Sequence, residues 1–211
     1  MAAAERPELF VTLEGGEGSG KTTLAASLAR ALEERGLSVC LTHEPGGTQL
    51  GQEVVRLLGG DGIIPAPLAE LLLFEADRVQ HVTELVRPAL DASKIVLCDR
   101  FTDSSLAYQG YGRGLDLNLI RRLNDVATGG LKPAITLLLD VPPEIGLARE
   151  GAQRDVTGRE SLEFHTRVRE GFLELAKAEP DRIIIIDATQ RLDDITRVAL
   201  KAIDALLPGR Q

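Results

Sequence analysis

The sequence predicts an α/β fold built on an open, doubly wound parallel sheet of five strands with helices on both faces. Five short apolar runs are rich in Leu or β-branched residues and are continuous, as in strands covered on both faces of a parallel sheet. Longer segments with helical periodicity alternate with these runs. The runs at 9–14, 95–99 and 134–140 end in the acids Glu14, Asp99 and Asp140, so we expect the functional edge at the carboxyl ends of the strands.

The apolar runs place the strands at 9–14, 37–42, Ile95–Asp99, 134–140 and Ile183–Asp187. The helical periodicity places helices at 22–35, 49–58, 68–90, 115–127, 143–149, 161–178 and 192–207. In the first of these helices Leu24, Leu28 and Leu32 share one face, and Gly36 is expected to end it.

A chain of 211 residues is long enough to bury about 70 % of its extended surface, so we expect one domain spanning 1–211. Two stretches interrupt the alternation of strands and helices. Residues 59–67 read as a loop. Residues 150–159 are polar, contain glycine and have helices on both sides, which predicts a short lid insertion.

Composition and charge exclude several classes of protein. The net charge of −8, from 24 basic and 32 acidic residues, disfavours a nucleic-acid-binding protein. No apolar run reaches the roughly 18 residues of a membrane-spanning helix, and the acidic first residues do not fit a signal peptide. Cys40 and Cys98 lie inside apolar runs and are interpreted as reduced core residues. We therefore expect a cytoplasmic protein with no membrane partner.

The strongest motif follows the first strand and precedes the first helix. It matches G-x-x-x-x-G-K-[ST] and consists of Gly15, Gly16, Glu17, Gly18, Ser19, Gly20, Lys21 and Thr22. The glycines allow backbone N–H groups to surround a phosphate, and the start of the helix adds positive potential. Lys21 is expected to reach the β- and γ-phosphates of a nucleotide, and Thr22 to bind Mg²⁺. The motif therefore predicts a P-loop nucleotide site.

A P-loop does not by itself specify the reaction. A guanine-specific N-K-x-D sequence is absent after the strands, because Asn124-Asp125 lies in a predicted helix, and the chain is short for a large motor ATPase. A small phosphotransferase remains. Asp99 at the end of the third strand is expected to hold Mg²⁺ or its water, and the adjacent Arg100 to bind a second phosphate. The alternative for this pair is a capping Asp beside a surface Arg.

Two further groups of side chains could bind a base or a sugar. The first provides hydroxyl and amide groups at neighbouring helical positions: Ser104, Ser105, Tyr108 and Gln109. The second is Phe74 and Arg78, which are four residues apart and so share a helix face. Considered alone, this second pair is more simply a core Phe and a surface Arg that partners Asp77.

Taken in order, the motifs resemble those of the thymidylate kinase family. They are Glu14 to Thr23, Glu44-Pro45-Gly46-Gly47-Thr48, residues 73–78, Asp99-Arg100-Phe101, residues 107–110, residues 139–144 and residues 187–190. The resemblance runs through residues 9–207. It implies a P-loop kinase fold, a homodimer, and the reaction of ATP with dTMP to give ADP and dTDP with Mg²⁺.

The resemblance also implies roles for the acceptor site. Phe74 would stack on thymine, Arg78 would bond its O4 edge, and Ser105 and Gln109 would lie near that edge. Tyr108 would crowd a 2′-hydroxyl on the sugar.

Arg100 would hold the acceptor phosphate, and Glu17 would lie beside it and the 3′-hydroxyl. The turn at Glu44 and Pro45 would close over the acceptor, with Pro45 in the cis form. On the donor side, Thr23 belongs to the phosphate-binding motif, and Gln190 with its neighbours would line the adenine.

The sequence departs from the family pattern in its arginines. The P-loop carries none, and the predicted lid has only Arg149, Arg154 and Arg159, without a dense arginine run. We expect Arg154 to reach the transferred phosphoryl group, while Arg149 could instead pack on adenine. The three histidines, His43, His81 and His165, are predicted to lie on the surface.

Two alternatives remain open at this point. One is a different nucleoside monophosphate kinase or a deoxynucleoside kinase. The other is a P-loop ATPase or switch protein that has no nucleotide acceptor.

Overall fold

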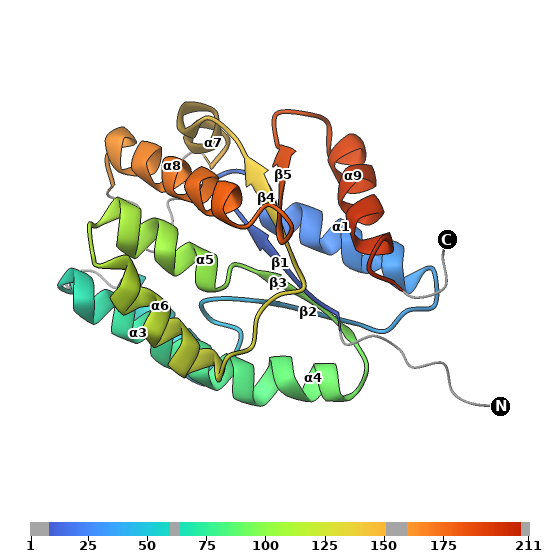
Figure 1. Ribbon diagram of the computed structural model, residues 1–211, viewed down its shortest axis with the longest axis horizontal. Helices are drawn as coiled ribbons and strands as arrows, with labels where there is room; N and C mark the ends of the chain where they lie inside the picture. Colours follow the sequence, from blue (N-terminus) through green and yellow to red (C-terminus); the bar gives the residue numbers. More distant parts are fainter. Residues whose placement is uncertain (1–8, 60–63, 151–159, 208–211) are drawn as a thin grey trace.

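The computed structural model describes residues 9–59, 64–150 and 160–207. A five-stranded sheet lies at the centre of the molecule in the order β2-β3-β1-β4-β5, and every neighbouring pair is parallel (Figure 1). The strands are β1 (Phe10–Glu14), β2 (Val39–His43), β3 (Ile95–Asp99), β4 (Ile135–Asp140) and β5 (Ile183–Asp187). The predicted α/β fold class is confirmed.

Helices cover both faces of the sheet (Figure 1). One face packs on α1 (Lys21–Glu33) and α9 (Leu192–Asp204), whose Leu28 and Ile203 share a core with Leu13 of β1. The helical segments on the other face are α3 (Pro67–His81), η1 (Val82–Val86), α4 (Arg87–Asp91), α5 (Thr102–Ser105), η2 (Leu106–Gly112), α6 (Leu117–Thr128) and α8 (Leu162–Ala178). α2 (Gln49–Gly59) packs on α3, and α7 (Pro143–Glu150) packs on α8.

The inner strands are buried on both faces, as their continuous apolar pattern predicts. In β1 every residue is buried, since Phe10 faces one core and Leu13 the other. The expectation is wrong for the two edge strands, where Leu41 of β2 is 48 % exposed and Ile185 of β5 is 49 % exposed. An edge strand has a neighbour on one side only, so its helical cover is incomplete.

The long helix predicted over 68–90 is instead three consecutive helical segments. α3 ends at His81, η1 has π-helical geometry over Val82–Val86, and α4 follows. Pro88 has no N–H to donate to the preceding turn, which disfavours regular α-helical bonding just before it. A second π-helical segment, η2, carries Tyr108 and Gln109, and such segments often occur at functional sites.

The acids that end β1, β3 and β4 lie at the same edge of the sheet, as expected for parallel strands. Leu13 pairs with Asp99, so the loop after β1 and the loop after β3 leave the sheet side by side. Within the described residues, we find no helix that is both long enough and apolar enough to cross a membrane.

Candidate active site

The loop between β1 and α1 is closed around the ammonium group of Lys21. This side chain is only 6 % exposed, and its Nζ donates to the carbonyl oxygens of Gly15 (3.0 Å) and Gly16 (2.8 Å). Burial, aided by the positive charge of Arg100, lowers the pKa of Lys21. The ammonium is thus desolvated at the start of α1, where a phosphate would replace its carbonyl partners.

The backbone of this loop requires glycine at two positions, Gly15 and Gly18. Gly18 has a left-handed φ of 61°, and a Cβ there would lie 1.9 Å from the carbonyl oxygen of Gly146. Gly15 has a φ of 143°, and its Cβ would lie 2.4 Å from the carbonyl oxygen of Leu139. The loop therefore packs closely on the end of β4 and on α7, and only glycine fits at these two positions.

The predicted metal ligands Thr22 and Asp99 meet directly. Thr22 Oγ1 donates to Asp99 Oδ2 over 2.6 Å. The other carboxylate oxygen, Oδ1, is buried and has no hydrogen-bond partner among the described residues. A hard cation or its coordinated water would satisfy this oxygen. Mg²⁺ commonly takes one or two protein oxygens with phosphate and water, so this pair fits that ion.

Arg100 adopts a backbone conformation that non-glycine residues rarely use, with a φ of 70°. Its N–H is held by the carbonyl oxygen of Leu13 at 2.9 Å. Its guanidinium donates to Glu17 Oε1 at 2.8 Å and lies over the ring of Tyr108, 4.9 Å from the ring centre. The hydroxyl of Tyr108 donates to the same oxygen of Glu17. These three side chains meet beside the phosphate loop, as predicted.

A cavity opens next to this group, lined by polar and charged side chains together with aromatic rings. Its walls contain ten residues predicted to act at the site: Glu17, Glu44, Pro45, Phe74, Arg78, Arg100, Ser104, Ser105, Tyr108 and Gln109. Phe74 is half-buried on this wall, so its ring is not part of a closed core. The bond between Glu44 and Pro45 is cis, as predicted.

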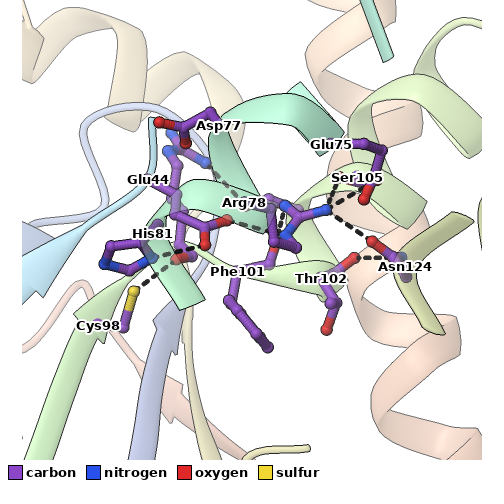
Figure 2. Close-up of polar contacts among 12 residues, drawn as sticks. Glu44, Glu75, Asp77, Arg78, His81, Cys98, Phe101, Thr102, Ser105 and Asn124 are labelled. Carbon is purple, nitrogen blue, oxygen red and sulfur yellow. Dashed lines mark hydrogen bonds and ion pairs between the residues drawn. The ribbon is translucent and has the colours of Figure 1, made fainter. Parts of the chain in front are cut away.

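Arg78 is buried in a network of acceptors, so the simpler prediction of a surface arginine is wrong. The side chain is 3 % exposed, and its Nε donates to Glu44 Oε2 at 2.9 Å (Figure 2). Its other guanidinium bonds go to Glu75, Ser105, Asn124 and the carbonyl oxygen of Phe101. Burial alone would lower the pKa of Arg78, but Glu44 and Glu75 raise it above its ordinary value. The guanidinium therefore stays charged, held between the carboxylates of Glu44 and Glu75.

Five residues of the cavity wall were not predicted as site residues, namely Glu70, Asp77, Phe101, Arg113 and Phe164. Arg113 makes a forked ion pair with Glu70, at 2.8 and 2.9 Å, and Gln109 also donates to Glu70 at 2.8 Å. Burial first acts to lower the pKa of Arg113, but its bonds to Glu70 raise it overall. The signal available in the sequence was an arginine between glycines directly after the 107–110 motif.

The histidines divide into three cases. His43 at the end of β2 is exposed, as predicted, and His165 on α8 is half-buried. The prediction for His81 is wrong, because it is 0 % exposed. Its ring is satisfied by the hydroxyl of Thr42 and the carboxylate of Glu44, which come from another part of the chain.

The residues predicted to contact adenine meet at the turn after β5. Gln190 donates to Asp187 Oδ2 at 2.8 Å, and Arg149 at the end of α7 donates to the carbonyl oxygen of Ala188 at 2.9 Å. The structure thus brings the side chain of Arg149 to the turn that carries Gln190. Thr23 lies exposed in the first turn of α1. Arg154 and the remainder of the predicted lid, residues 151–159, lie outside the described residues.

The doubly wound sheet, the phosphate loop with its Thr–Asp pair, and a second cavity with Arg100 on its wall define the class of P-loop phosphotransferases. Comparison with known proteins identifies the branch of this class. A family model described as thymidylate kinase matches residues 13–198. The chain therefore belongs to the thymidylate kinase family.

Individual relatives agree with this assignment. A thymidylate kinase of Synechococcus sp. (strain JA-2-3B'a(2-13)) is 54 % identical over 201 residues, covering 95 % of this chain and 96 % of the relative. One of Deinococcus radiodurans is 50 % identical over 189 residues, covering 89 % and 92 %. The crystal structure of thymidylate kinase from Ehrlichia chaffeensis superposes with a TM-score of 0.78 at 38 % identity, covering 92 % of this chain and 98 % of that one.

Proposed function

We propose that the protein transfers the γ-phosphoryl group of ATP to dTMP, giving ADP and dTDP. One observation carries the proposal. The cavity that has Phe74 and Arg78 on its wall meets the phosphate loop at the Arg100–Glu17 pair. An acceptor nucleotide bound there would have its base toward Phe74 and its phosphate toward the donor site.

The reaction requires alignment and charge neutralisation rather than a general base, because the acceptor phosphate is already an anion. Lys21 would leave the carbonyl oxygens of Gly15 and Gly16 and bind the β- and γ-phosphates of ATP. Arg100 would hold the acceptor phosphate. Arg100 is already held by Glu17 and the ring of Tyr108 before substrate arrives, so this cation needs little reorganisation at the transition state.

Thr22 and Asp99 would hold Mg²⁺, which neutralises charge on the donor phosphates when it is bound. The buried oxygen Oδ1 of Asp99 supports this assignment, because the cation or its water would supply the missing partner.

The base and sugar of the acceptor would be recognised by separate groups. Phe74 offers a ring for stacking, and Arg78 offers a charged donor that Glu44 holds in place. The hydroxyl of Tyr108 is tied to Glu17 and its ring lies under Arg100, which fixes the ring beside the position of the sugar. A rigid ring at that position would crowd a ribose 2′-hydroxyl and favour deoxyribose.

We also propose that the protein is a homodimer in the cytoplasm. Three neighbouring helices carry exposed apolar side chains, namely Leu50 and Leu57 of α2, Leu68, Leu72 and Val79 of α3, and Val126 of α6. A second copy could cover them. The two free cysteines, Cys40 and Cys98, support a reducing compartment.

A coupled assay of ADP release across a panel of nucleoside monophosphates tests the proposed function. We expect turnover with dTMP to exceed that with dUMP, UMP, dCMP and AMP, and to stop when Mg²⁺ is chelated. ADP release that does not depend on the acceptor would instead identify an ATPase. A preference for another monophosphate would identify a different kinase of the same class.

A further inference from the structure

The buried histidine His81 links strand β2 to the wall of the acceptor cavity. Its Nε2 lies 2.7 Å from Thr42 Oγ1. Its Nδ1 lies 2.7 Å from Glu44 Oε1 (Figure 2). The other oxygen of Glu44, Oε2, receives Nε of Arg78 at 2.9 Å. Thr42, His81, Glu44 and Arg78 therefore form one continuous chain of hydrogen bonds, and each of these side chains is less than a tenth exposed.

The chemistry of this chain fixes the direction of its bonds. Ionised Glu44 can only accept, so Nδ1 of His81 carries a proton and donates it. In the neutral imidazole, Nε2 then accepts from the hydroxyl of Thr42. Each oxygen of the Glu44 carboxylate thereby has its own donor, His81 on one side and Arg78 on the other, which holds the carboxylate plane in a single orientation.

The backbone around His81 is also fixed closely. A Cβ at Gly47 would lie 3.0 Å from His81 Cδ2 and 3.0 Å from Thr42 Oγ1, so the turn after Pro45 packs directly on the imidazole. The π-helical segment η1 begins at the residue after His81. The N–H of Glu44 is held by the carbonyl oxygen of Asp99 at 3.0 Å. The Glu44–Pro45 turn is thus clamped between β3 and α3.

We propose that His81 is a positioning residue for the acceptor nucleotide. It acts through Glu44 and sets both the Glu44–Pro45 turn and the guanidinium of Arg78 at the cavity wall. His81 does not itself line the cavity, so its effect on the acceptor is indirect. This inference rests on the proposed function, since it assumes that the cavity binds dTMP.

Two isosteric variants separate the two bonds of the imidazole. An asparagine amide can place its nitrogen near the position of Nδ1 and keep the bond to Glu44, whereas a glutamine amide can place its nitrogen near Nε2 and keep only the contact with Thr42. We expect His81→Gln to raise the KM for dTMP about tenfold, the cost of one charge-assisted bond, with the KM for ATP unchanged. We expect His81→Asn to retain the wild-type KM for dTMP.

A matched control separates positioning from loss of stability. Val86 lies in η1, is 0 % exposed and has no place in the hydrogen-bond chain. Val86→Ala should lower the melting temperature through a cavity and leave the KM for dTMP unchanged. Glu44→Gln combined with His81→Gln should raise this KM no further than the more severe single variant, because both changes break the same link.

The outcomes are distinguishable. If wild-type enzyme does not phosphorylate dTMP, the proposed function fails and the inference with it. If wild-type enzyme is active but His81→Gln keeps the wild-type KM for dTMP, or if His81→Asn raises it as much as His81→Gln does, only the positioning role is overturned. Should His81→Gln fail to fold, the comparison passes to His81→Asn, for which a raised KM for dTMP contradicts the proposal.

Discussion

The guanidinium of Arg100 donates to the carboxylate of Glu17, with Nη2 2.8 Å from Oε1. This bond joins the residue after β3 to the middle of the phosphate loop, which follows β1. The two segments meet because Leu13 and Asp99 are paired in adjacent parallel strands. A phosphate bound by Arg100 would therefore lie next to the donor loop, which is the arrangement that direct phosphoryl transfer needs.

Removal of the Arg100 guanidinium should impair both binding of the acceptor and transfer. We expect Arg100→Met to lower kcat/KM for dTMP by about two orders of magnitude or more, because a charge-assisted contact to the phosphate is lost. Arg100→Lys keeps the charge but not the fork, and should recover only part of the activity. Steady-state kinetics on both variants, with circular dichroism as the folding control, provides the measurement. Near-normal kinetics for Arg100→Met would contradict the assigned role.

Lys21 is the buried cation of the phosphate loop, and it should meet charge that develops between donor and acceptor. We expect Lys21→Ala to cost on the order of 3 kcal/mol in transition-state stabilisation, like the loss of another preorganised donor. Single-turnover rates at saturating ATP and dTMP measure this loss. A folded variant that retains a third of the wild-type turnover would refute the assignment.

Phe74 tests recognition of the base. Base stacking on an aromatic ring is worth roughly 1–3 kcal/mol, so Phe74→Ala should raise the KM for dTMP by about tenfold and leave the KM for ATP almost unchanged. Phe74→Leu provides a control that keeps apolar volume without the aromatic face. If the KM values for both substrates rise together in Phe74→Ala, the side chain stabilises the fold and does not read the base.

The strands and their order along the chain were predictable because a parallel sheet buries its inner strands on both faces. β3 and β5 have the predicted bounds. The π-helical segments η1 and η2 were not predictable, since their wide turns depend on packing and, near Pro88, on a missing donor. The start of α6 was missed by two residues, although Asp116 caps it by accepting from the N–H of Asn118.

Within the site, local motifs predicted the residues that line the cavity, but not how those residues are held. Lys21 and Thr22 follow from spacing within one short segment. His81 was expected on the surface, as was Arg78 when its motif is considered alone, because burial of a polar helix residue depends on its partners. For His81 the partner Glu44 lies 37 residues away, and for Arg78 the partner Asn124 lies 46 residues away. Such pairings arise from tertiary structure and leave no periodicity in the sequence.

Glu14 gives the folded protein a distinct pH dependence. Its carboxyl group is fully buried and accepts from the N–H of Phe101 at 2.8 Å and from Ser104 Oγ at 2.6 Å. Burial, with a contribution from Asp103, raises the pKa of Glu14 from 4.5 to about 8. Between these two pKa values the carboxyl group of Glu14 is protonated in the folded state and ionised in the unfolded state.

The stability that this proton contributes is fully present below the unfolded pKa of 4.5 and is lost as pH rises through about 8. Glu14→Gln has no such proton, so its free energy of unfolding lacks this loss. Between about pH 5 and pH 8.5 the variant should become more stable relative to the wild type by on the order of a few kcal/mol. Urea unfolding at a series of pH values measures the difference. Parallel pH profiles for the two proteins would contradict a raised pKa at Glu14.

The lid prediction concerns the arginine that the phosphate loop lacks. An arginine delivered at the transition state is worth about 10³–10⁵ in rate in related chemistry, and we expect Arg154 to supply it. Arg154→Ala should lower kcat far more than it raises either KM. Arg149 is tied to the carbonyl oxygen of Ala188, so Arg149→Ala should mainly raise the KM for ATP.

Alanine variants at Arg149, Arg154 and Arg159, measured side by side, separate these roles. A normal kcat for Arg154→Ala with a collapse at Arg159 would move the role to the other lid arginine. Normal kcat values for all three would show that the lid supplies no catalytic charge.

The central claim is that the γ-phosphoryl group passes directly from ATP to dTMP across the Arg100–Glu17 junction. The most direct test incubates the enzyme with γ-³²P-labelled ATP, Mg²⁺ and dTMP and separates the labelled products. The account predicts that the label appears in dTDP, in step with the ADP released, and that little inorganic phosphate is formed. Label that appears in inorganic phosphate at a rate indifferent to dTMP would contradict it.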